Sequence, residues 1–291
     1  MVLSKLLVID GMALLFRHFF ATSFRNHFMY NSNNIPTNGI QGTIRHIYKI
    51  IEMDKPTNVI VTWDMSSKTV RNEWFSNYKI DRPAPPEELR PQFDYVKEVL
   101  AELGFFQIGV TGYEADDIIG TLAKHHDNIT IVSGDRDLLQ VLAPGVKLWL
   151  TKKGYTEYNK YTEERFIEEY GVTPEQFIDV KALMGDSGDG YFGVKGIGEK
   201  TALNLIKKHG SIEKLLENLD TCTPSQKRNI ENDMEHLLMS QKLARIITDV
   251  PFNIEEALTL SPFRYDEKLT MDVLNEHDLT ISRKYIERLE L

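Results

Sequence analysis

Three short apolar segments, each running into an aspartate, decide the fold of this chain: LLVID (Leu6–Asp10), NVIVTWD (58–64) and NITIVSGD (128–135). Each is short, rich in β-branched residues and bounded by polar or turn residues, which is typical of a buried β-strand. Residues 42–53, 87–103 and 116–124 lie between them and repeat apolar residues at helical spacing. Strands that alternate with helices predict an α/β domain with a mostly parallel sheet.

The aspartates that end these segments are Asp10, Asp64 and Asp135. Ligands of open α/β sheets bind beyond the carboxyl ends of the strands, so three such carboxylates are expected to gather at one edge. An aspartate after a strand is also a common helix N-cap. For three strands together, we give equal weight to capping and to a functional site.

Three further motifs supply more acids. EADD (114–117) opens a predicted helix, SGDRD (133–137) follows a predicted strand, and GDSGDG (185–190) forms a glycine-rich loop. Acids in a first helical turn complement the helix dipole, and an isolated Asp–Gly loop is usually a turn. The calcium EF-hand is excluded because its twelfth-position Glu is missing. The candidate metal ligands are Asp10, Asp64, Glu114, Asp116, Asp117, Asp135, Asp137, Asp186 and Asp189.

Carboxylate oxygens select hard cations such as Mg²⁺ or Mn²⁺. A carboxylate cluster that holds two such ions is the arrangement for in-line hydrolysis of a phosphodiester.

Two basic segments complement the acids. YKIDR (78–82) places Lys79 and Arg82 three residues apart, before a proline-rich connector at 82–91. This is either a solvated surface pair or a pair that grips a phosphate. In GVKGIGEKTA (193–202), glycines precede a predicted helix start, which lets backbone N–H groups approach a phosphate. No strand immediately precedes this segment and the Walker A spacing is absent, which argues against a dinucleotide or nucleotide loop.

The overall charge first argues against nucleic acid, since 43 acids face 34 Lys and Arg for a net charge of −9. Its distribution reverses that view. Residues 211–291 carry 16 acids and 10 bases, and residues 1–210 carry 27 acids and 24 bases. Without the nine candidate ligands, 18 acids face 24 bases in the first 210 residues. That remainder suits a phosphate backbone.

Other classes of protein are excluded by composition. The single cysteine, Cys222, cannot build a disulfide framework or a cysteine zinc site. No apolar run approaches the roughly 18–20 residues of a membrane span. The first ten residues contain only Lys5 as a base and lack signal-peptide or transit-peptide character. We expect a globular protein of the cytoplasm.

A boundary is expected near GVTP (171–174), which ends a predicted helix at 161–170. We predict an α/β domain over residues 1–172 and a mostly helical domain over residues 173–291.

Six motifs together resemble one family. VIDG (8–11), YKIDR, EADD, SGDRDLLQ (133–140), GDSGD and GVKGIGEKTA follow one another as in bacterial 5′–3′ exonucleases. These are flap-endonuclease-like nucleases, and they include the N-terminal nuclease domain of DNA polymerase I. The resemblance extends from residue 1 to about residue 260. The chain is similar to the stand-alone form, because it has no room for a polymerase.

The resemblance implies a PIN-like (resolvase-like) core, a helical arch at about 78–104, and a C-terminal domain with a helix–hairpin–helix (helix–three-turn–helix) element. It implies that the nine acids bind two Mg²⁺ or Mn²⁺ ions and that Lys79 and Arg82 face the scissile phosphate. The implied DNA contacts are Tyr78, Lys79, Arg82, Lys195, Gly196, Gly198, Lys200 and Thr201. A K⁺ ion is implied at the backbone carbonyls of Leu183, Met184, Val194 and Ile197.

The implied activity is 5′–3′ exonuclease and 5′-flap endonuclease, on DNA with free 5′ ends, 5′ flaps or branched junctions. The implied protein is a monomer of the bacterial cytoplasm, associated with the nucleoid, in replication or repair. One alternative is a non-catalytic binder of branched DNA, although a binder gains nothing from nine repulsive acids. Another is a metal-dependent phosphomonoesterase of small molecules, which would have no use for the basic hairpin.

The chain departs from the family pattern at three places. Gly188 and Gly190 stand in a loop that commonly reads GDSSDN, Phe192 replaces a common proline, and Asp81 replaces a frequent asparagine. Both loop aspartates remain, so we expect metal binding to be preserved.

Overall fold

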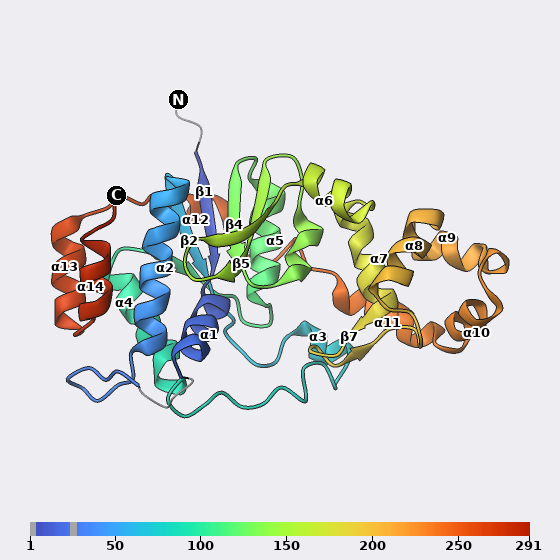
Figure 1. Cartoon of the computed structure of the whole chain (residues 1–291), viewed down its shortest axis with the longest axis horizontal. Coiled ribbons are helices and arrows are strands. Elements are labelled where there is room, and N and C mark those ends of the chain that lie inside the picture. Colours follow the sequence, from blue (N-terminus) through green and yellow to red (C-terminus); the bar gives the residue numbers. More distant parts are fainter. Residues whose placement is uncertain (1–3, 24–27) are drawn as a thin grey trace.

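The computed structural model describes residues 4–23 and 28–291. A six-stranded sheet forms the centre, in the order β3 (Phe106–Ile108), β2 (Asn58–Thr62), β1 (Leu6–Asp10), β4 (Ile129–Ser133), β5 (Val146–Lys153) and β6 (Glu157–Tyr161). All neighbouring strands are parallel except β5 and β6. The predicted α/β class is therefore confirmed, with the three aspartate-ended strands adjacent at its middle (Figure 1).

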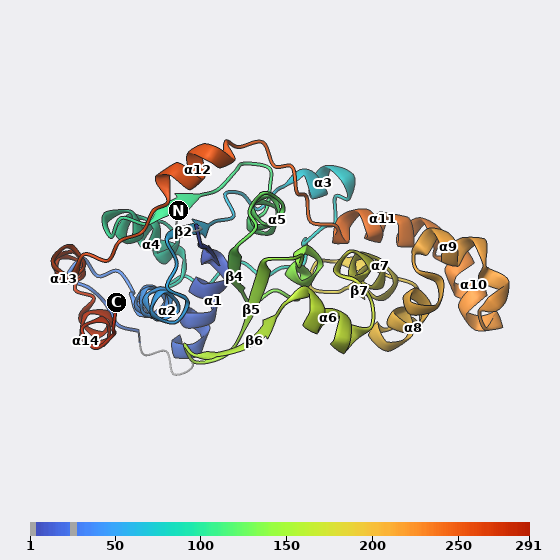
Figure 2. The ribbon, with the colours of Figure 1, turned by 90° about the horizontal axis from the view of Figure 1, so that it is seen from above.

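The continuous apolar run of β1 contributes side chains to two hydrophobic cores, because successive side chains of a strand point to opposite faces of the sheet. Leu6 and Val8 belong to a buried cluster that includes the inner face of α5 (Ala115–His125) and extends to α7 (Pro174–Met184). Leu7 and Ile9 pack with α1 (Gly11–Thr22) and α2 (Asn38–Asp54). Helices therefore cover both faces of the sheet, as Figure 2 shows.

A helical extension follows the sheet and lies at the right of Figure 1. It consists of α6 (Glu163–Tyr170), α7, α8 (Glu199–His209), α9 (Ile212–Glu217), α10 (Pro224–Asn232) and α11 (Met234–Ala244). The short strands β7 (Gly185–Asp186) and β8 (Tyr191–Phe192) pair and enclose the GDSGDG loop. A Cβ atom at Gly193 would lie 2.3 Å from the Leu183 carbonyl oxygen, so glycine is required there.

Residues 75–89 form a segment that we call the strap. It connects α3 (Val70–Trp74) to α4 (Arg90–Glu102). The strap consists of turns and irregular chain, so only α4 is helical within the predicted arch at 78–104. Pro83, Pro85 and Pro86 explain this, because proline lacks an N–H donor and disfavours helix in the residue before it. Tyr78 and Leu89 are buried near the two ends of the strap.

The last helices return to the sheet. After α12 (Ile254–Leu260), the helices α13 (Glu267–Glu276) and α14 (Thr280–Ile286) lie beside α2, far from α8–α10 in both views (Figures 1 and 2). Their buried residues Val273, Leu274, Leu279 and Ile286 belong to the same core as α1 and α2. The division of the chain at residue 172 stays a prediction, and this return is a feature that the sequence patterns did not indicate.

Among the described residues, no helix combines the length and the apolar character that crossing a bilayer requires.

The return of α13 to the core predicts that two leucines of that helix contribute differently to the free energy of unfolding. Leu274 is fully buried in the core that also contains residues of α1 and α2, whereas Leu269 is 42% exposed. Leu274→Ala is expected to lower the free energy of unfolding by about 2–5 kcal/mol, because it leaves a cavity in the core. Leu269→Ala should change it by less than about 0.5 kcal/mol. Urea unfolding measures both, and equal effects would contradict this packing.

Candidate active site

The three strand-end aspartates both cap helices and face one cavity. Asp10 accepts a hydrogen bond from the Ala13 backbone N–H (2.9 Å) and another from the Ser133 hydroxyl (2.6 Å). Asp64 accepts from the Ala115 N–H at the start of α5 (2.8 Å). Asp135 caps the 3₁₀ helix Arg136–Val141 and accepts from the Asp137 N–H (2.8 Å). Capping and a shared site are therefore compatible here.

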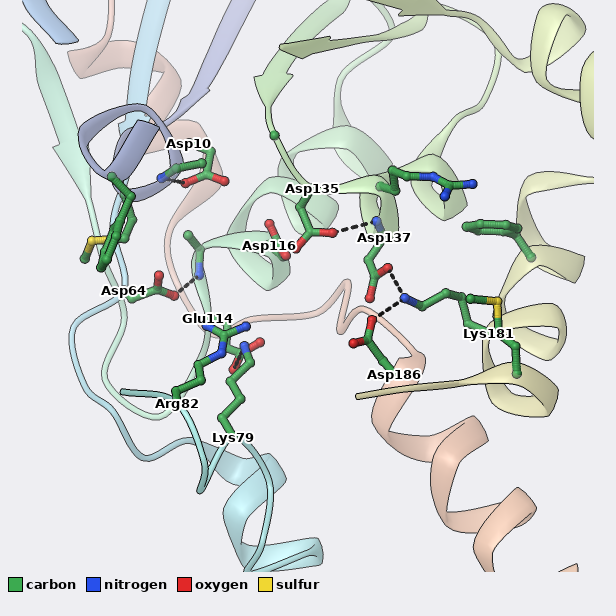
Figure 3. A pocket seen from close by; sticks show the side chains of 18 of the residues that line it. Asp10, Asp64, Lys79, Arg82, Glu114, Asp116, Asp135, Asp137, Lys181 and Asp186 are labelled. Carbon is green, nitrogen blue, oxygen red and sulfur yellow. Dashed lines mark hydrogen bonds and ion pairs between the residues drawn. The ribbon is translucent and has the colours of Figure 1, made fainter. Parts of the chain in front are cut away.

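The cavity has a volume of about 580 Å³ and lies at the carboxyl edge of the sheet (Figure 3). Seven of the nine predicted ligands line it: Asp10, Asp64, Glu114, Asp116, Asp135, Asp137 and Asp186. Lys79 and Arg82 line it from the strap, and Lys181 from α7. The structure therefore brings most of the predicted acids and both predicted phosphate contacts to one place.

Burial and mutual repulsion disfavour full ionisation of this cluster. Burial, followed by the charges of Asp64 and Asp135, raises the pKa of Asp10 to about 7. Burial and neighbouring carboxylates also raise the pKa of Asp116 well above its ordinary value. Burial and Asp135 raise the pKa of Asp137 to about 6. Cations at this edge would relieve the repulsion.

The repulsion divides the acids into two groups. Asp10, Asp64 and Asp116 interact with one another and with Asp135. Asp137 interacts with Asp186 and, again, with Asp135. Asp135 is therefore common to both groups.

Lys181 was not identified from the sequence. Its Nζ lies 2.6 Å from a carboxylate oxygen of Asp137 and 2.6 Å from one of Asp186, and its side chain is buried. Burial opposes its charge, but the two carboxylates outweigh this and raise the pKa of Lys181 to about 12. A charged residue within the largely apolar segment 177–184 was the available signal.

Arg136 is a second cavity residue without a sequence-based assignment, although it stands inside the SGDRD motif. Its guanidinium donates to Glu199 (2.6 Å) and to the Tyr170 hydroxyl (3.2 Å). It therefore connects the carboxyl edge of the sheet to α6 and α8.

Ion pairs hold the strap at the rim of the cavity. Lys79 Nζ lies 2.7 Å from Glu114, and Arg82 Nη2 lies 2.7 Å from Asp189. The Lys79 backbone N–H also donates to the Asp189 carbonyl (2.9 Å). Lys79 has a positive φ of 56°, which is uncommon outside glycine and costs conformational energy. The strap is thus held in a specific conformation over the acids.

Asp189 and Tyr78 occupy this rim and do not line the cavity. The Asp189 carboxylate accepts from Arg82 and from the Tyr78 hydroxyl (2.9 Å), so its role as an ion ligand stays a prediction. The Tyr78 ring is buried beside Ile178 and Tyr191, and its hydroxyl also donates to Glu114. The structure does not present the Tyr78 side chain to DNA.

Asp117 has a different place from the one expected. Both of its oxygens bind the buried guanidinium of Arg71, each at 2.7 Å. One of these oxygens also accepts from the Ile247 N–H, and the Asp117 side chain is fully buried. Because a helix turns about 100° per residue, Asp116 faces the cavity while Asp117 faces the core. We therefore withdraw Asp117 as a metal ligand.

The basic hairpin forms one continuous surface next to α8. Gly198 is the N-cap of α8, and Lys200 and Thr201 lie in its first turn. Gly196 has a positive φ of 77° in the preceding turn. The backbone of Lys195 is fixed on both sides: its N–H donates to Asp233, and its carbonyl accepts from Asn229, each at 2.8 Å. The five predicted contacts of this segment therefore lie together.

Two of the four backbone carbonyls predicted to bind K⁺, those of Leu183 and Val194, accept backbone hydrogen bonds. The Leu183 carbonyl accepts the Val194 N–H (2.8 Å), and the Val194 carbonyl accepts the Ile197 N–H (3.0 Å). Binding of K⁺ through Leu183, Met184, Val194 and Ile197 stays a prediction.

The donor set of the cavity fits hard divalent cations, because every candidate ligand is a carboxylate. Within residues 4–23 and 28–291, however, no three Asp, Glu, His or Cys side chains stand close enough together to enclose an ion. Several of these carboxylate oxygens instead form ion pairs with Lys79 or Lys181 or accept hydrogen bonds from backbone N–H groups. Ion binding therefore requires these side chains to adjust.

The sequence matches two adjacent family descriptions. Residues 5–171 match the 5′–3′ exonuclease, N-terminal resolvase-like domain, and residues 172–266 match the 5′–3′ exonuclease, C-terminal SAM fold. The chain belongs to the 5′–3′ exonuclease family. The predicted resemblance is therefore confirmed, together with a resolvase-like domain and a helical one.

Two relatives illustrate the similarity. A "5′–3′ exonuclease" of Bacillus subtilis is 49% identical, over 98% of this chain and 97% of its own length. A DNA polymerase I of Lactococcus lactis is 40% identical over 86% of this chain. The match covers only 29% of that polymerase.

Among solved structures, the bacteriophage T5 5′-exonuclease with bound zinc ions superimposes with a TM-score of 0.69 at 25% identity. The alignment covers 98% of this chain and 100% of the T5 chain. The T5 D15 flap endonuclease with DNA and metal ions has a TM-score of 0.68 at 24% identity, over 98% of this chain and 100% of its own. These likenesses support the fold of the family.

The different surroundings of Asp116 and Asp117 predict opposite effects on stability. In EDTA, Asp117→Asn is expected to lower the free energy of unfolding by about 3–5 kcal/mol, because it leaves Arg71 buried without its partner. Asp116→Asn removes a repelled carboxyl and should leave stability unchanged or raise it. Urea unfolding compares the two variants, and a loss for Asp116→Asn as large as that for Asp117→Asn would refute these placements.

The raised pKa of Asp10 predicts a pH effect on the protein in EDTA. Below about pH 4, the carboxyl is protonated in both folded and unfolded chains, and its contribution to stability is fully present. Between about pH 4 and pH 7 the unfolded chain releases this proton while the folded protein retains it, so stability falls with rising pH, and the loss is complete above about pH 7. Each unit of pKa difference corresponds to about 1.4 kcal/mol.

Asp10→Asn is expected to weaken this pH dependence in urea unfolding at pH 5 and pH 8. Asp94→Asn is the matched control, because the Asp94 side chain is 98% exposed. If wild type and Asp10→Asn showed the same pH dependence of stability, the raised pKa of a buried Asp10 would be excluded.

Proposed function

We propose that this chain is a divalent-metal-dependent 5′–3′ exonuclease and structure-specific 5′-flap endonuclease that hydrolyses DNA phosphodiesters. The single observation that carries the proposal is the cavity with seven carboxylates, faced by Lys79 and Arg82 of the strap. A site for small phosphomonoesters would not need the basic hairpin beside α8. A pure DNA binder would not need seven acids in a cavity.

The two groups of acids support two ion sites. One is assigned to Asp10, Asp64 and Asp116, the other to Asp137 and Asp186, with Asp135 between them and Glu114 at the rim. Oxygen donors favour Mg²⁺ or Mn²⁺. When bound, two such ions supply an activated water and charge stabilisation at the leaving oxygen. The T5 exonuclease solved with zinc is consistent with a divalent metal in this fold.

Lys79 and Arg82 are assigned to the scissile phosphate. Their present partners, Glu114 and Asp189, are carboxylates at the rim, so at each cation a phosphate would replace one anion by another. Arg82 can donate in a bidentate manner and Lys79 as a point charge. Lys181 bridges Asp137 and Asp186 and so fixes the positions of both carboxylates at the cavity.

The hairpin residues Lys195, Gly196, Gly198, Lys200 and Thr201 are assigned to the backbone of the duplex next to the cut. Their turn precedes a helix N-terminus, where N–H groups favour a phosphate. K⁺ at the neighbouring carbonyls would add positive charge there. We propose that the protein acts as a monomer on free 5′ ends, 5′ flaps and branched junctions, at the nucleoid in the bacterial cytoplasm.

A flap substrate labelled at either end tests the proposal. With Mg²⁺, the wild type should release short products from the 5′ end and cut at the flap base, leaving 5′-phosphates, and EDTA should stop both reactions. Asp135→Ala and Asp186→Ala should lower the cleavage rate at least about 100-fold, because each removes a carboxylate assigned to an ion site. Flap affinity should be retained in both.

Asp127→Ala is the matched control, since Asp127 is exposed just before β4, at the strand end opposite the cavity. It should cleave like the wild type. Flap binding by the wild type without cleavage in Mg²⁺ or Mn²⁺ would instead support a non-catalytic binder. Hydrolysis of small phosphomonoesters alone would reject nuclease activity.

A further inference from the structure

One buried tyrosine next to the cavity has a hydroxyl without a hydrogen-bond partner. Tyr191 lies on β8 and is 2% exposed, and no residue in the described part of the chain forms a hydrogen bond with its buried hydroxyl. The hydroxyl of Tyr78, in the same apolar cluster, instead donates to Glu114 and Asp189. A buried donor without an acceptor costs free energy, so we expect Tyr191 to find an acceptor in another state of the protein.

Strand pairing places Tyr191 beside a predicted ion ligand. Its register partner on β7 is Asp186, and the side chains of directly opposed residues lie on the same face of an antiparallel pair. The loop between the two strands is held by the Asp186 carboxylate, which accepts from the N–H groups of Gly188 (2.8 Å) and Asp189 (3.2 Å). Tyr191 does not itself line the cavity, so it supports the acids and is not one of the groups that face a ligand.

The acids that act most strongly on this hydroxyl are the two that Lys181 bridges. After burial, the charges of Asp137 and then of Asp186 contribute most to raising the pKa of Tyr191. A hydroxyl with a raised pKa stays protonated and can donate a hydrogen bond. Lys181 Nζ lies 2.6 Å from one oxygen of each carboxylate, as Figure 3 shows. The neutral donor of Tyr191 is therefore directed toward two anions that are already paired with a cation.

Ion binding by Asp137 and Asp186 would change the partners of their oxygens. Lys181 and a divalent ion repel each other, so Lys181 must release at least one carboxylate when the ion binds. A carboxylate has about four lone-pair sites and can accept a hydrogen bond while it ligates an ion. Tyr191 can supply that hydrogen bond without adding positive charge. Donors that bind ligating carboxylates from outside orient them and raise the affinity for the ion.

We infer that Tyr191 is a positioning residue for the ion assigned to Asp137 and Asp186, and that its hydroxyl donates to this carboxylate pair when Lys181 releases oxygens to the ion. The hydroxyl touches neither the ion nor DNA. The inference rests on the proposed function for the presence of an ion at this pair. The same hydroxyl thus destabilises the ion-free protein and stabilises the ion-bound one.

The test compares Tyr191→Phe with Tyr161→Phe, the matched control, because Tyr161 is also buried but its hydroxyl donates to Glu169 (2.9 Å). In EDTA, urea unfolding should show an unchanged or raised midpoint for Tyr191→Phe and a lowered midpoint for Tyr161→Phe. Calorimetric titration with Mn²⁺ should show two ions in the wild type. Tyr191→Phe should bind one of them about 10-fold more weakly, and Tyr161→Phe should bind both like the wild type.

Two further variants assign the effect to one ion. In the Asp64→Ala protein, which lacks a ligand of the other group, Tyr191→Phe should still weaken binding of the remaining ion about 10-fold. In the Asp186→Ala protein, Tyr191→Phe should have no further effect. In flap cleavage, Tyr191→Phe should raise the Mg²⁺ concentration for half-maximal rate about 10-fold, and excess Mg²⁺ should restore the rate.

A Tyr191→Phe protein that binds both ions as tightly as the wild type, or that loses stability in EDTA as Tyr161→Phe does, would overturn the inference. Equal effects of Tyr191→Phe in the Asp64→Ala and Asp186→Ala proteins would overturn it as well. Failure of the proposed function is distinguishable, because the wild type would then bind two Mn²⁺ ions and still not cleave flap DNA in Mg²⁺.

Discussion

The repulsion between carboxylates at one edge of the sheet is the constraint on which the rest of this structure depends. Parallel strands bring Asp10, Asp64 and Asp135 together, and α5 adds Asp116. Such a cluster destabilises the folded chain unless cations compensate it. The protein supplies some of its own: Lys181 stands between two acids, and Lys79 of the strap pairs with Glu114. The position of the strap follows from the same electrostatics as the site.

A second electrostatic interaction, the buried ion pair of Arg71 and Asp117, stabilises the segments next to the cavity. Arg71 precedes the strap and Asp117 lies on α5. The Arg71 guanidinium also donates to the carbonyl groups of Leu243, in the last turn of α11, and of Arg245, which follows that helix. This pair joins three segments: α3 just before the strap, α5, and the chain at the end of α11. Because both charges are buried, loss of either leaves the other without the ion partner that binds it at 2.7 Å. The acids of EADD thus have separate roles, one group facing the cavity and one residue facing the core.

Residue type and order were sufficient to predict the α/β class, the adjacent aspartate-ended strands and seven cavity acids. They could not distinguish Asp116 from Asp117, since side-chain direction depends on the packing of α5. Lys181 was missed because a charged residue in a largely apolar segment is a weak signal until its carboxylate partners are placed, and Asp179 stands in the same segment. The strap was expected to be helical from the resemblance, although its prolines oppose a helix. Strands β3, β5 and β6 have weaker apolar patterns and were not identified.

The return of α13 and α14 to α2 changes how the helical extension is connected. Segment α6–α11 is, in effect, an insertion: the chain leaves the sheet after β6 and comes back to it through α12. Two covalent links oppose hinge rotation more than one link does, and the second is fastened to α5 through Arg71. A fragment cut after α6 would lack α13 and α14 and would expose the apolar face of α2. The two sequence-defined domains of the family are thus joined by two passages of the chain in this protein, one after β6 and one before α12.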